Sequence, residues 1–429
     1  DVNAGTGDVL IEATNATVST VKSGADVKGS GAGAEVGVGV SVGLNVGVNT
    51  TVAEIQDSAK LTGGNNLNIN AKSDHTMTTT VTGGAKGANI AVTPVIGVTI
   101  GVNTTAADLG TGTGLNLTGG FGMSAEQSST QATTVTGQTE GNVGVGASIG
   151  IGVATDTVTA GVERDIKAAN DITIDARSTS KSSTSATASV AGGEKTEAAD
   201  NTKPAGGGKT VDQEITAQTD KGKAAGKTTA AKGSAAPSSG TSATQKLDDQ
   251  KPAPTSEENN ESGGVSVAAA VGVNAAIATT VASIDKGRKI ESTGGAVKVQ
   301  SQAQTDASAK ADGTQTDPAA TTDLGVGAAV ALNVGVSTNV ASIGDNADID
   351  ANKGVTVRAT IPAGEKNDFG ADAKSGAGAG EVGVAGSLAA NVVVNTTVAA
   401  IEGDKDLSGT GADVNAGTGD VLIEATNAT

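Results

Sequence analysis

The residues able to do nucleophilic or metal chemistry are few in this chain. His75 is the only histidine, and the 429 residues contain no cysteine. A Ser-His-Asp or Cys-His nucleophile and a zinc site all need residues of these types, so we expect none of them. Carboxylates are plentiful but scattered, and no pair recurs in a form that indicates acid–base catalysis. The sequence predicts a non-enzymatic protein with no catalytic residue and no cofactor, in which His75 is an exposed strand residue.

One acidic run has the spacing of metal ligands. Asp348, Asp350 and Asn352 lie at alternate positions, as oxygen ligands do in calcium loops. The EF-hand pattern fails, because Gly354 comes one residue late and no Glu follows at the required distance. The calcium-binding nonapeptide of β-helices does not recur either. A polar turn between strands is the favoured interpretation, and these three residues remain the calcium candidate.

Two other motifs suggest chemistry only faintly. Asn49, Asn103 and Asn395 each begin an Asn-Thr-Thr phrase, which matches the N-glycosylation pattern. Stacked at one corner of successive repeats, these residues would form turns and hydrogen-bond ladders, which is the favoured interpretation. Residues 206–210 faintly resemble a phosphate-binding loop but lack its spacing.

Composition favours long, regular β-sheet. The chain has 63 Gly and only two Phe, with no Trp or Tyr, and its apolar residues are mostly Val, Ala and Ile. The net charge of −18 argues against nucleic acid or an anionic membrane as partner. No apolar run approaches the ~20 residues of a membrane-spanning helix. We therefore expect an all-β protein that does not span a membrane.

The chain repeats itself over a long distance. Residues 1–17 recur without change as residues 413–429, an offset of 412 residues. The simplest explanation is a parent protein that repeats a unit of about 412 residues in tandem, so that residues 413–429 start the next unit. Two identical sealing strands within one closed domain are the alternative.

A shorter repeat lies within this unit. A strand-like segment of alternating residues occurs six times and then begins again, starting at Val9, Leu67, Phe121, Ile172, Val297, Val355 and Val421. Five of the six steps span 51 to 66 residues, and the fourth spans 125 because of a low-complexity insertion. The sequence predicts β-solenoid repeats at 1–193 and 263–429, with a flexible insertion at 194–262.

The fold expected from these repeats is a parallel β-solenoid of six coils of about 55 residues, with long Gly/Val strands. Narrow coils of about 20 residues, three per repeat, are the alternative. In residues 36–48, Val and Leu occupy one parity, and mainly Gly occupies the other. We expect the Val face to be interior.

The bare face is a strip formed by Gly37, Gly39, Gly43 and Gly47. Such a strip indicates close packing. It would contact either a neighbouring shaft, as a lateral packing strip, or the opposite wall of its own coil, which we favour. A solvated face is the remaining alternative.

At this point the sequence resembles a known class of repeats. The phrase GVGVSVGLNVGVNTTVAEI at residues 37–55, followed by a polar turn and LNINAKS at 67–73, resembles the repeats of giant bacterial surface proteins. These include the filamentous-haemagglutinin-like adhesins and the fusobacterial leukotoxin type. The resemblance covers almost the whole chain outside the insertion. It implies a β-solenoid shaft exported to the bacterial cell surface and a role in adhesion or cell–cell contact.

Two functions follow as expectations. In the first, the chain is the structural shaft of a secreted, extracellular adhesin or filament, whose partners are copies of itself, along or between shafts, and other cell surfaces. In the second, it is a binding module that directly recognises glycans or proteins of a host or a neighbouring cell. Lectin faces usually present aromatic residues to sugars, and their scarcity here favours the shaft.

Overall fold

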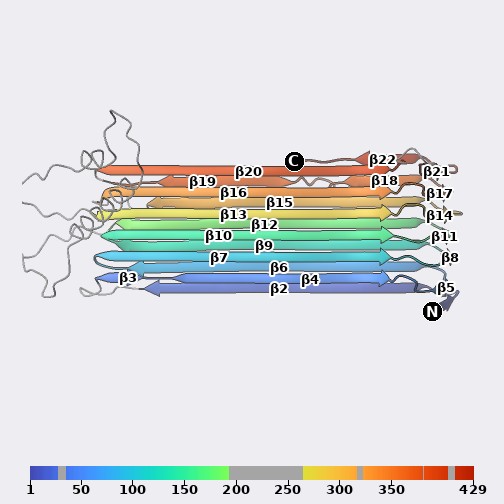
Figure 1. Cartoon of the computed structure of the whole chain (residues 1–429), viewed down its shortest axis with the longest axis horizontal. Coiled ribbons are helices and arrows are strands. Elements are labelled where there is room, and N and C mark those ends of the chain that lie inside the picture. Colours follow the sequence, from blue (N-terminus) through green and yellow to red (C-terminus); the bar gives the residue numbers. More distant parts are fainter. Residues whose placement is uncertain (28–34, 193–263, 316–321, 380, 404–410) are drawn as a thin grey trace, which may run out of the picture. The chain divides into compact units, whose positions relative to one another are not determined.

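The described part of the chain is an all-β, parallel β-solenoid (Figure 1). The computed structural model describes residues 1–27, 35–192, 264–315, 322–379, 381–403 and 411–429. The chain divides into two units, Asp1–Glu194 with Gly263–Thr429, and Lys195–Ser262. The expected insertion at 194–262 corresponds to the second unit and lies outside the described residues.

Three walls make up each coil of the solenoid. The first wall is a parallel sheet of eight strands, in which β19 pairs with β15 beside β18. Its strands are β2 (Val9–Val27), β6 (Leu67–Lys86), β9 (Phe121–Gly141), β12 (Ile172–Gly192), β15 (Val297–Gln315), β18 (Val355–Thr360), β19 (Asp368–Gly376) and β22 (Val421–Ala425).

The second wall is a parallel sheet of seven strands. They are β3 (Val36–Val38), β4 (Ser41–Ile55), β7 (Ile90–Leu109), β10 (Val143–Val162), β13 (Gly264–Ile284), β16 (Thr322–Ile343) and β20 (Val382–Ile401). Both β3 and β4 pair with β7, and the gap between them lies beside Pro94 of β7. Because proline has no N–H to donate, the ladder weakens at that position.

The end wall consists of short strands that close each coil. They are β1 (Val2–Gly5), β5 (Leu61–Gly63), β8 (Leu115–Leu117), β11 (Ile166–Ala168), β14 (Lys289–Ser292), β17 (Asp348–Ala351) and β21 (Asp413–Asn415). In this wall β1 pairs with β5, and β8 to β21 form a separate parallel ladder in chain order. One coil therefore runs through a short strand, a long strand of the first wall and a long strand of the second wall.

The repeats identified in the sequence each form one wide coil. The seven repeat segments begin strands that pair in one unbroken ladder through Val9, Leu67, Phe121, Ile172, Val297, Val355 and Val421. Each step of this ladder is one repeat of the sequence. Coils of about 20 residues would place three steps between successive segments, so the narrow-coil alternative is wrong.

The apolar core lies where the three walls meet. The ladder residues Leu67, Phe121 and Ile172 are fully or almost fully buried, and Ile166 and Ile290 of the end wall pack into the same cluster. Large aliphatic side chains fit here because three walls enclose a wider space than two facing sheets do. Burial of these side chains is the main force that holds each coil on the next.

Farther along the long strands the interior becomes thin. At Gly39 an added Cβ would fall on the carbonyl oxygen of Gly84 in the facing wall, and at Gly327 on that of Gly376. Inward positions there hold mostly Gly, Ala, Ser, Thr and Asn. Two sheets with small inward residues can approach more closely than the usual ~10 Å.

This thin interior reverses the expected orientation of the valine face. Val40 and Val46 are each 57% exposed, and Val334 is 37% exposed, so the expectation that the valine parity is interior is wrong. The inward valines of the first wall, such as Val81 and Val135, lie against Gly43 and Gly97 of the second wall. There is thus no room for valine at both facing positions, and the glycine parity of the second wall faces inward. Alternation of residue types separates two faces but does not say which one is inside.

Candidate functional site

The outer face of the first wall is polar and charged. Ion pairs link side chains of successive coils, as between Lys72 and Glu126 at 3.2 Å or between Arg358 and Glu424 at 2.9 Å. These side chains are largely exposed, and surface pairs of this kind contribute little to stability. The charges keep this face hydrated.

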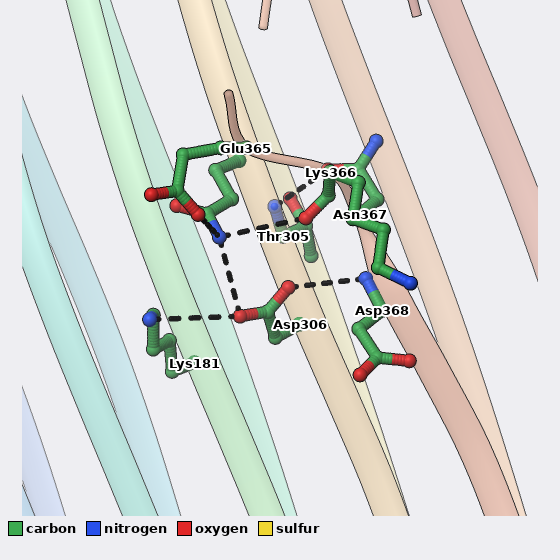
Figure 2. Close-up of polar contacts among 8 residues, drawn as sticks. Lys181, Thr305, Asp306, Glu365, Lys366, Asn367 and Asp368 are labelled. Atoms are coloured by element: carbon green, nitrogen blue, oxygen red, sulfur yellow. Dashed lines mark hydrogen bonds and ion pairs between the residues drawn. The ribbon is translucent and has the colours of Figure 1, made fainter. Parts of the chain in front are cut away.

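One irregular loop interrupts this face (Figure 2). Residues 361–367 bulge between β18 and β19, and Asn367 is buried within the bulge. Its Oδ1 accepts the backbone N–H of Thr305 at 2.8 Å, in place of a strand carbonyl. Next to it, Asp306 accepts the N–H of Asp368 at 3.0 Å and lies 3.7 Å from Lys181. The side-chain amide of Asn367 thus repairs the ladder where the strand leaves it.

A shallow depression lies beside this loop. Its volume is about 280 Å³, and its lining includes Lys181, Asp306 and Asp368. Asp306 is already engaged by Lys181 and by the backbone N–H of Asp368. The depression can offer hydrogen bonds to a polar ligand, but its residues form no catalytic arrangement.

The calcium candidate is dispersed on the end wall. Asp348 lies in β17 and forms an ion pair with Lys289 at 2.8 Å, while Asp350 accepts a hydrogen bond from Asn415 at 3.1 Å. The side chain of Asn352 is exposed, beyond the end of β17. Among the described residues, no three His, Cys, Asp or Glu side chains gather as a metal site would require. The acidic run is a strand and its following turn.

His75 is buried in the interior of the solenoid. Its exposure is 1%, so the expectation that it is exposed is wrong. It shares the inward parity of Leu67 and Ile69 on β6, and neither ring nitrogen has a hydrogen-bond partner. Burial lowers the pKa of His75, against the opposing effect of Asp156. The imidazole is therefore neutral at pH 7.

Asp156 lies on the facing wall and is also buried. Its Oδ1 accepts a hydrogen bond from Asn103 at 2.7 Å, and its Oδ2 accepts one from Ser180 at 2.5 Å. Burial raises the pKa of Asp156, although these hydrogen bonds act in the opposite direction. No cation lies within ion-pair distance of this carboxylate in the part of the chain that the structure describes. His75 and Asp156 thus belong to one buried polar cluster, in which Ser180 and Asn103 hold the carboxyl group of Asp156.

Asparagine ladders run through the same interior. Asn49 donates to Asn103 at 2.7 Å, which gives the ladder expected for the Asn-Thr-Thr phrases. The ladder lies within the long strands β4 and β7, so its expected position at a corner is wrong. In later coils Asn274 donates to Asn333 at 3.0 Å, and Asn333 donates to Asn391 at 2.9 Å. These amides satisfy one another in place of an apolar core.

Arg164 holds three successive turns together, and nothing in the sequence pattern indicated it. Its side chain is fully buried, and it donates to the carbonyls of Gly110, Ala59, Gln56 and Thr111 at 2.5 to 3.1 Å. Burial lowers its pKa, and Asp57 opposes this effect. The guanidinium satisfies carbonyls that the turns leave without strand partners.

The glycine strip faces the first wall across the interior, and its nearest contacts are with β6 of the following coil. Gly37 and Gly39 lie against the backbone of β6, Gly43 against Val81 and Gly47 against Met77. The strip therefore faces an opposite wall, as the favoured alternative expected, but the strand nearest to it belongs to the next coil and not to its own. The outward surface of the second wall is formed by the other parity.

That outward surface is the most unusual feature of the described molecule. Six strands present apolar side chains in rows across the wall, and we call this surface the apolar face. One row consists of Val42, Ile96, Ile149, Val271, Val330 and Leu388. The next row toward the end wall consists of Leu44, Val98, Ile151, Val273, Leu332 and Ala390. Val42 and Leu388 are more than half exposed, at 58% and 56%.

The apolar face is too large to be incidental. Thirteen positions along the strands and six coils across them span roughly 43 Å by 29 Å, or about 1,200 Å². The largest apolar patch of a typical soluble monomer is about 300–600 Å². The surface is therefore the candidate functional site.

The stacked parallel sheets define a class, the parallel β-solenoids. Comparisons with protein-family models, with curated proteins and with solved structures find no match for this chain. No helix among the described residues has the length and hydropathy to cross a membrane.

Proposed function

We propose that this chain is a segment of the structural shaft of a giant, tandem-repeat bacterial surface adhesin or extracellular filament. In this role the protein is secreted to the cell surface and mediates attachment or cell–cell contact. Its contribution is mechanical: it continues a stack of coils and presents extended surfaces. Its partners are further copies of the unit and other cell surfaces.

One observation carries this proposal. Val9 and Val421 are equivalent residues of the two identical copies of the 17-residue sequence, and they occupy the same ladder six coils apart. The second copy therefore enters the stack as the first coil of a following unit. A further unit would extend the solenoid without a change of register, as repeat proteins require. Its segment equivalent to β4 would pair with the open edge of β20.

The width of the coil indicates what such a shaft provides. Six coils advance by only ~29 Å, whereas strands of about 20 residues extend over ~66 Å. A unit of this kind extends the shaft only a short distance for its number of residues, but it adds a large area of flat surface. This geometry supports a role in assembly more than a role as a thin spacer.

Direct recognition of host or neighbouring-cell molecules is the second candidate function. The observation in its favour is the polar depression near Lys181 and Asp306. Its volume lies below the ~300–1,000 Å³ of typical ligand pockets. The depression lacks the aromatic side chains that stack on sugars. The shaft is the better-supported function.

The test compares proteins that contain one, two and three tandem units by electron microscopy of single particles. We expect each added unit to extend one continuous stack by ~29 Å along the coil axis. In a matched control, a flexible Gly-Ser linker of the same length replaces residues 413–429 between two units. This control should give two separate bodies. Separate bodies with the native junction would contradict the proposal.

A second measurement tests the location. Antibodies raised against the solenoid should label intact cells of the source bacterium, and external protease should remove the signal. Labelling only after the cells are opened would contradict a surface shaft. Binding of the one-unit protein to host glycans, abolished by substitution of Lys181, would favour the second candidate function.

A further inference from the structure

We propose that the apolar face docks against the same face of a second copy of this chain, so that two solenoids associate side by side. This inference deepens the proposed shaft function and rests on it, because it names the surface by which shafts would pair. It differs from axial stacking, which uses the strand edges and leaves the apolar face uncovered.

The two outer faces of the solenoid differ sharply in charge. On the first wall, outward positions carry ion pairs, such as that between Lys310 and Asp372. On the second wall, the outward parity of β10 from Val143 to Val153 has no charged residue, and neither does that of β13 from Val265 to Ala275. Solvation alone does not account for this contrast. A sheet face without charges is normally an association surface.

The area of the apolar face suits a protein partner of equal size. Its ~1,200 Å² exceeds the ~800 Å² that each partner buries in a standard stable interface. A second copy is the one partner certain to carry a matching surface of these dimensions. Because neither face is charged in its central part, juxtaposing them would bury no unpaired charge.

The relief of the face also fits a sheet-on-sheet contact. One row across the wall consists of small or compact residues, namely Pro94, Ala147, Ala269, Ala328 and Gly386. It lies between rows of Val, Ile and Leu, so that a groove runs along the stacking direction between two ridges. A ridge of the second copy can enter this groove when two sheets pack face to face at ~10 Å. Such an isologous contact closes as a two-fold dimer.

The central residues of the face provide the test. Ile151 and Val273 are neighbours on adjacent strands, so the double variant Ile151→Lys with Val273→Lys places two charges in the middle of the contact. The matched control is Ser183→Lys with Ser308→Lys, a neighbouring pair on the exposed first wall. Both variants change the net charge equally, and both lie in strands of the central coils.

Sedimentation velocity of the full chain over a wide concentration range gives the readout. We expect the wild type and the serine-pair control to dimerise. The dissociation constant of the Ile151/Val273 lysine variant dimer should be at least ~100-fold higher than that of the wild type, since buried unpaired charges are costly. Far-UV circular dichroism checks that the fold is retained. If the lysine variant misfolds, Ile151→Thr with Val273→Thr replaces it and should weaken association by ~10-fold.

Three outcomes would overturn the proposal. The wild type could remain monomeric at the highest concentration, or the serine-pair control could lose association as fully as the Ile151/Val273 variant. The wild type could also remain monomeric but bind vesicles of neutral phosphatidylcholine through this face, which would assign the face to lipid. Failure of docking would leave the axial advance per tandem unit unchanged, so it is distinguishable from failure of the shaft function.

Discussion

Asn103 and Asp156 lie on adjacent coils and are joined by a 2.7 Å hydrogen bond from the amide Nδ2 to the carboxylate Oδ1. Both side chains are buried in the thin interior between the two long walls, where most inward residues are small or polar. Polar ladders therefore hold the stack together at this level, and Asp156 is the position where a carboxyl group takes the place of an amide in such a ladder.

Replacing this carboxyl group by an amide should stabilise the protein. Asp156 is ionised at pH 7 in the unfolded chain, whereas burial disfavours its ionised form in the folded protein and so raises its pKa. We expect Asp156→Asn to raise the free energy of unfolding by about 1 kcal/mol, because Asn keeps the acceptor for Asn103 and removes the desolvated charge. Chemical denaturation at pH 7 measures this. The control is Glu12→Gln, an exposed carboxylate on β2, which should have little effect.

The pH dependence of that difference gives a second readout of the same substitution. A raised pKa means that the folded wild type binds a proton more readily than the unfolded chain. The gain in free energy of unfolding that Asp156→Asn provides should therefore shrink as the pH falls below the pKa of Asp156 in the folded protein. It should vanish near the pKa of Asp in the unfolded chain, about 3.9. An advantage that is independent of pH would contradict this explanation.

His75 should make the protein sensitive to mild acid. Its folded pKa is lowered by burial, so the unfolded chain takes up the proton first. The contribution of neutral His75 to the free energy of unfolding is thus fully present above the pKa of histidine in the unfolded chain, about 6.5, and is lost as the pH falls below that value. In the Asp156→Asn background, we expect the midpoint of thermal unfolding to drop between pH 7 and 5. The same protein with His75→Gln should lack that drop, and an equal drop in both would contradict the assignment.

The close approach of the walls predicts opposite effects at two glycines of the first wall. At Gly313 an added Cβ would meet the carbonyl oxygen of Ala328, whereas nothing lies within 4 Å of such an atom at Gly370. Gly313→Ala should cost about 2 kcal/mol or more, because the facing backbone must move. Gly370→Ala should be neutral or slightly stabilising. Thermal unfolding of the two variants checks this, and equal effects would mean that the walls are not in contact there.

Arg164 should be far more important than the arginine in the following turn. We expect Arg164→Met to cost about 3 kcal/mol, because several carbonyls lose a charged donor in a buried place. Arg288 lies in the next coil, in a more exposed position, and donates to the backbone carbonyls of Lys286 and Glu163 at 3.0 and 3.3 Å. Arg288→Met should cost less than about 1 kcal/mol. Similar losses of unfolding free energy in both variants would show that the guanidinium of Arg164 does not hold the three turns together.

The repeat in the sequence was sufficient to predict the wide coils, but not which side chains of the second wall face the interior. Val9, Leu67 and Phe121 were identified as equivalent, and they begin paired strands of one ladder. The inward orientation of His75 could also have been predicted, because His75 lies an even number of residues after the buried Leu67 and side chains alternate between the two faces of a strand. The orientation of the valine parity could not, because it depends on how closely two walls approach. That distance is a property of the assembled coil.

The buried arginine had no sequence signal at all. Arg164 follows β10 in a polar turn, and only the stacking of three turns places their carbonyls around it. The apolar face was hidden for a related reason. A row such as Val42, Ile96 and Ile149 is assembled from residues 53 or 54 positions apart, and its exposure follows only from the orientation of the wall.

The stacking of wide coils can be measured most directly between the two sequence copies. Leu10 and Leu422 are equivalent, outward residues of β2 and β22, and they are 61% and 45% exposed. Because the chain has no cysteine, Leu10→Cys with Leu422→Cys gives two specific sites for spin labels. Double electron–electron resonance should give a distance near ~29 Å, six steps of one ladder. A distance near ~85 Å, as eighteen narrow coils would give, would contradict the account.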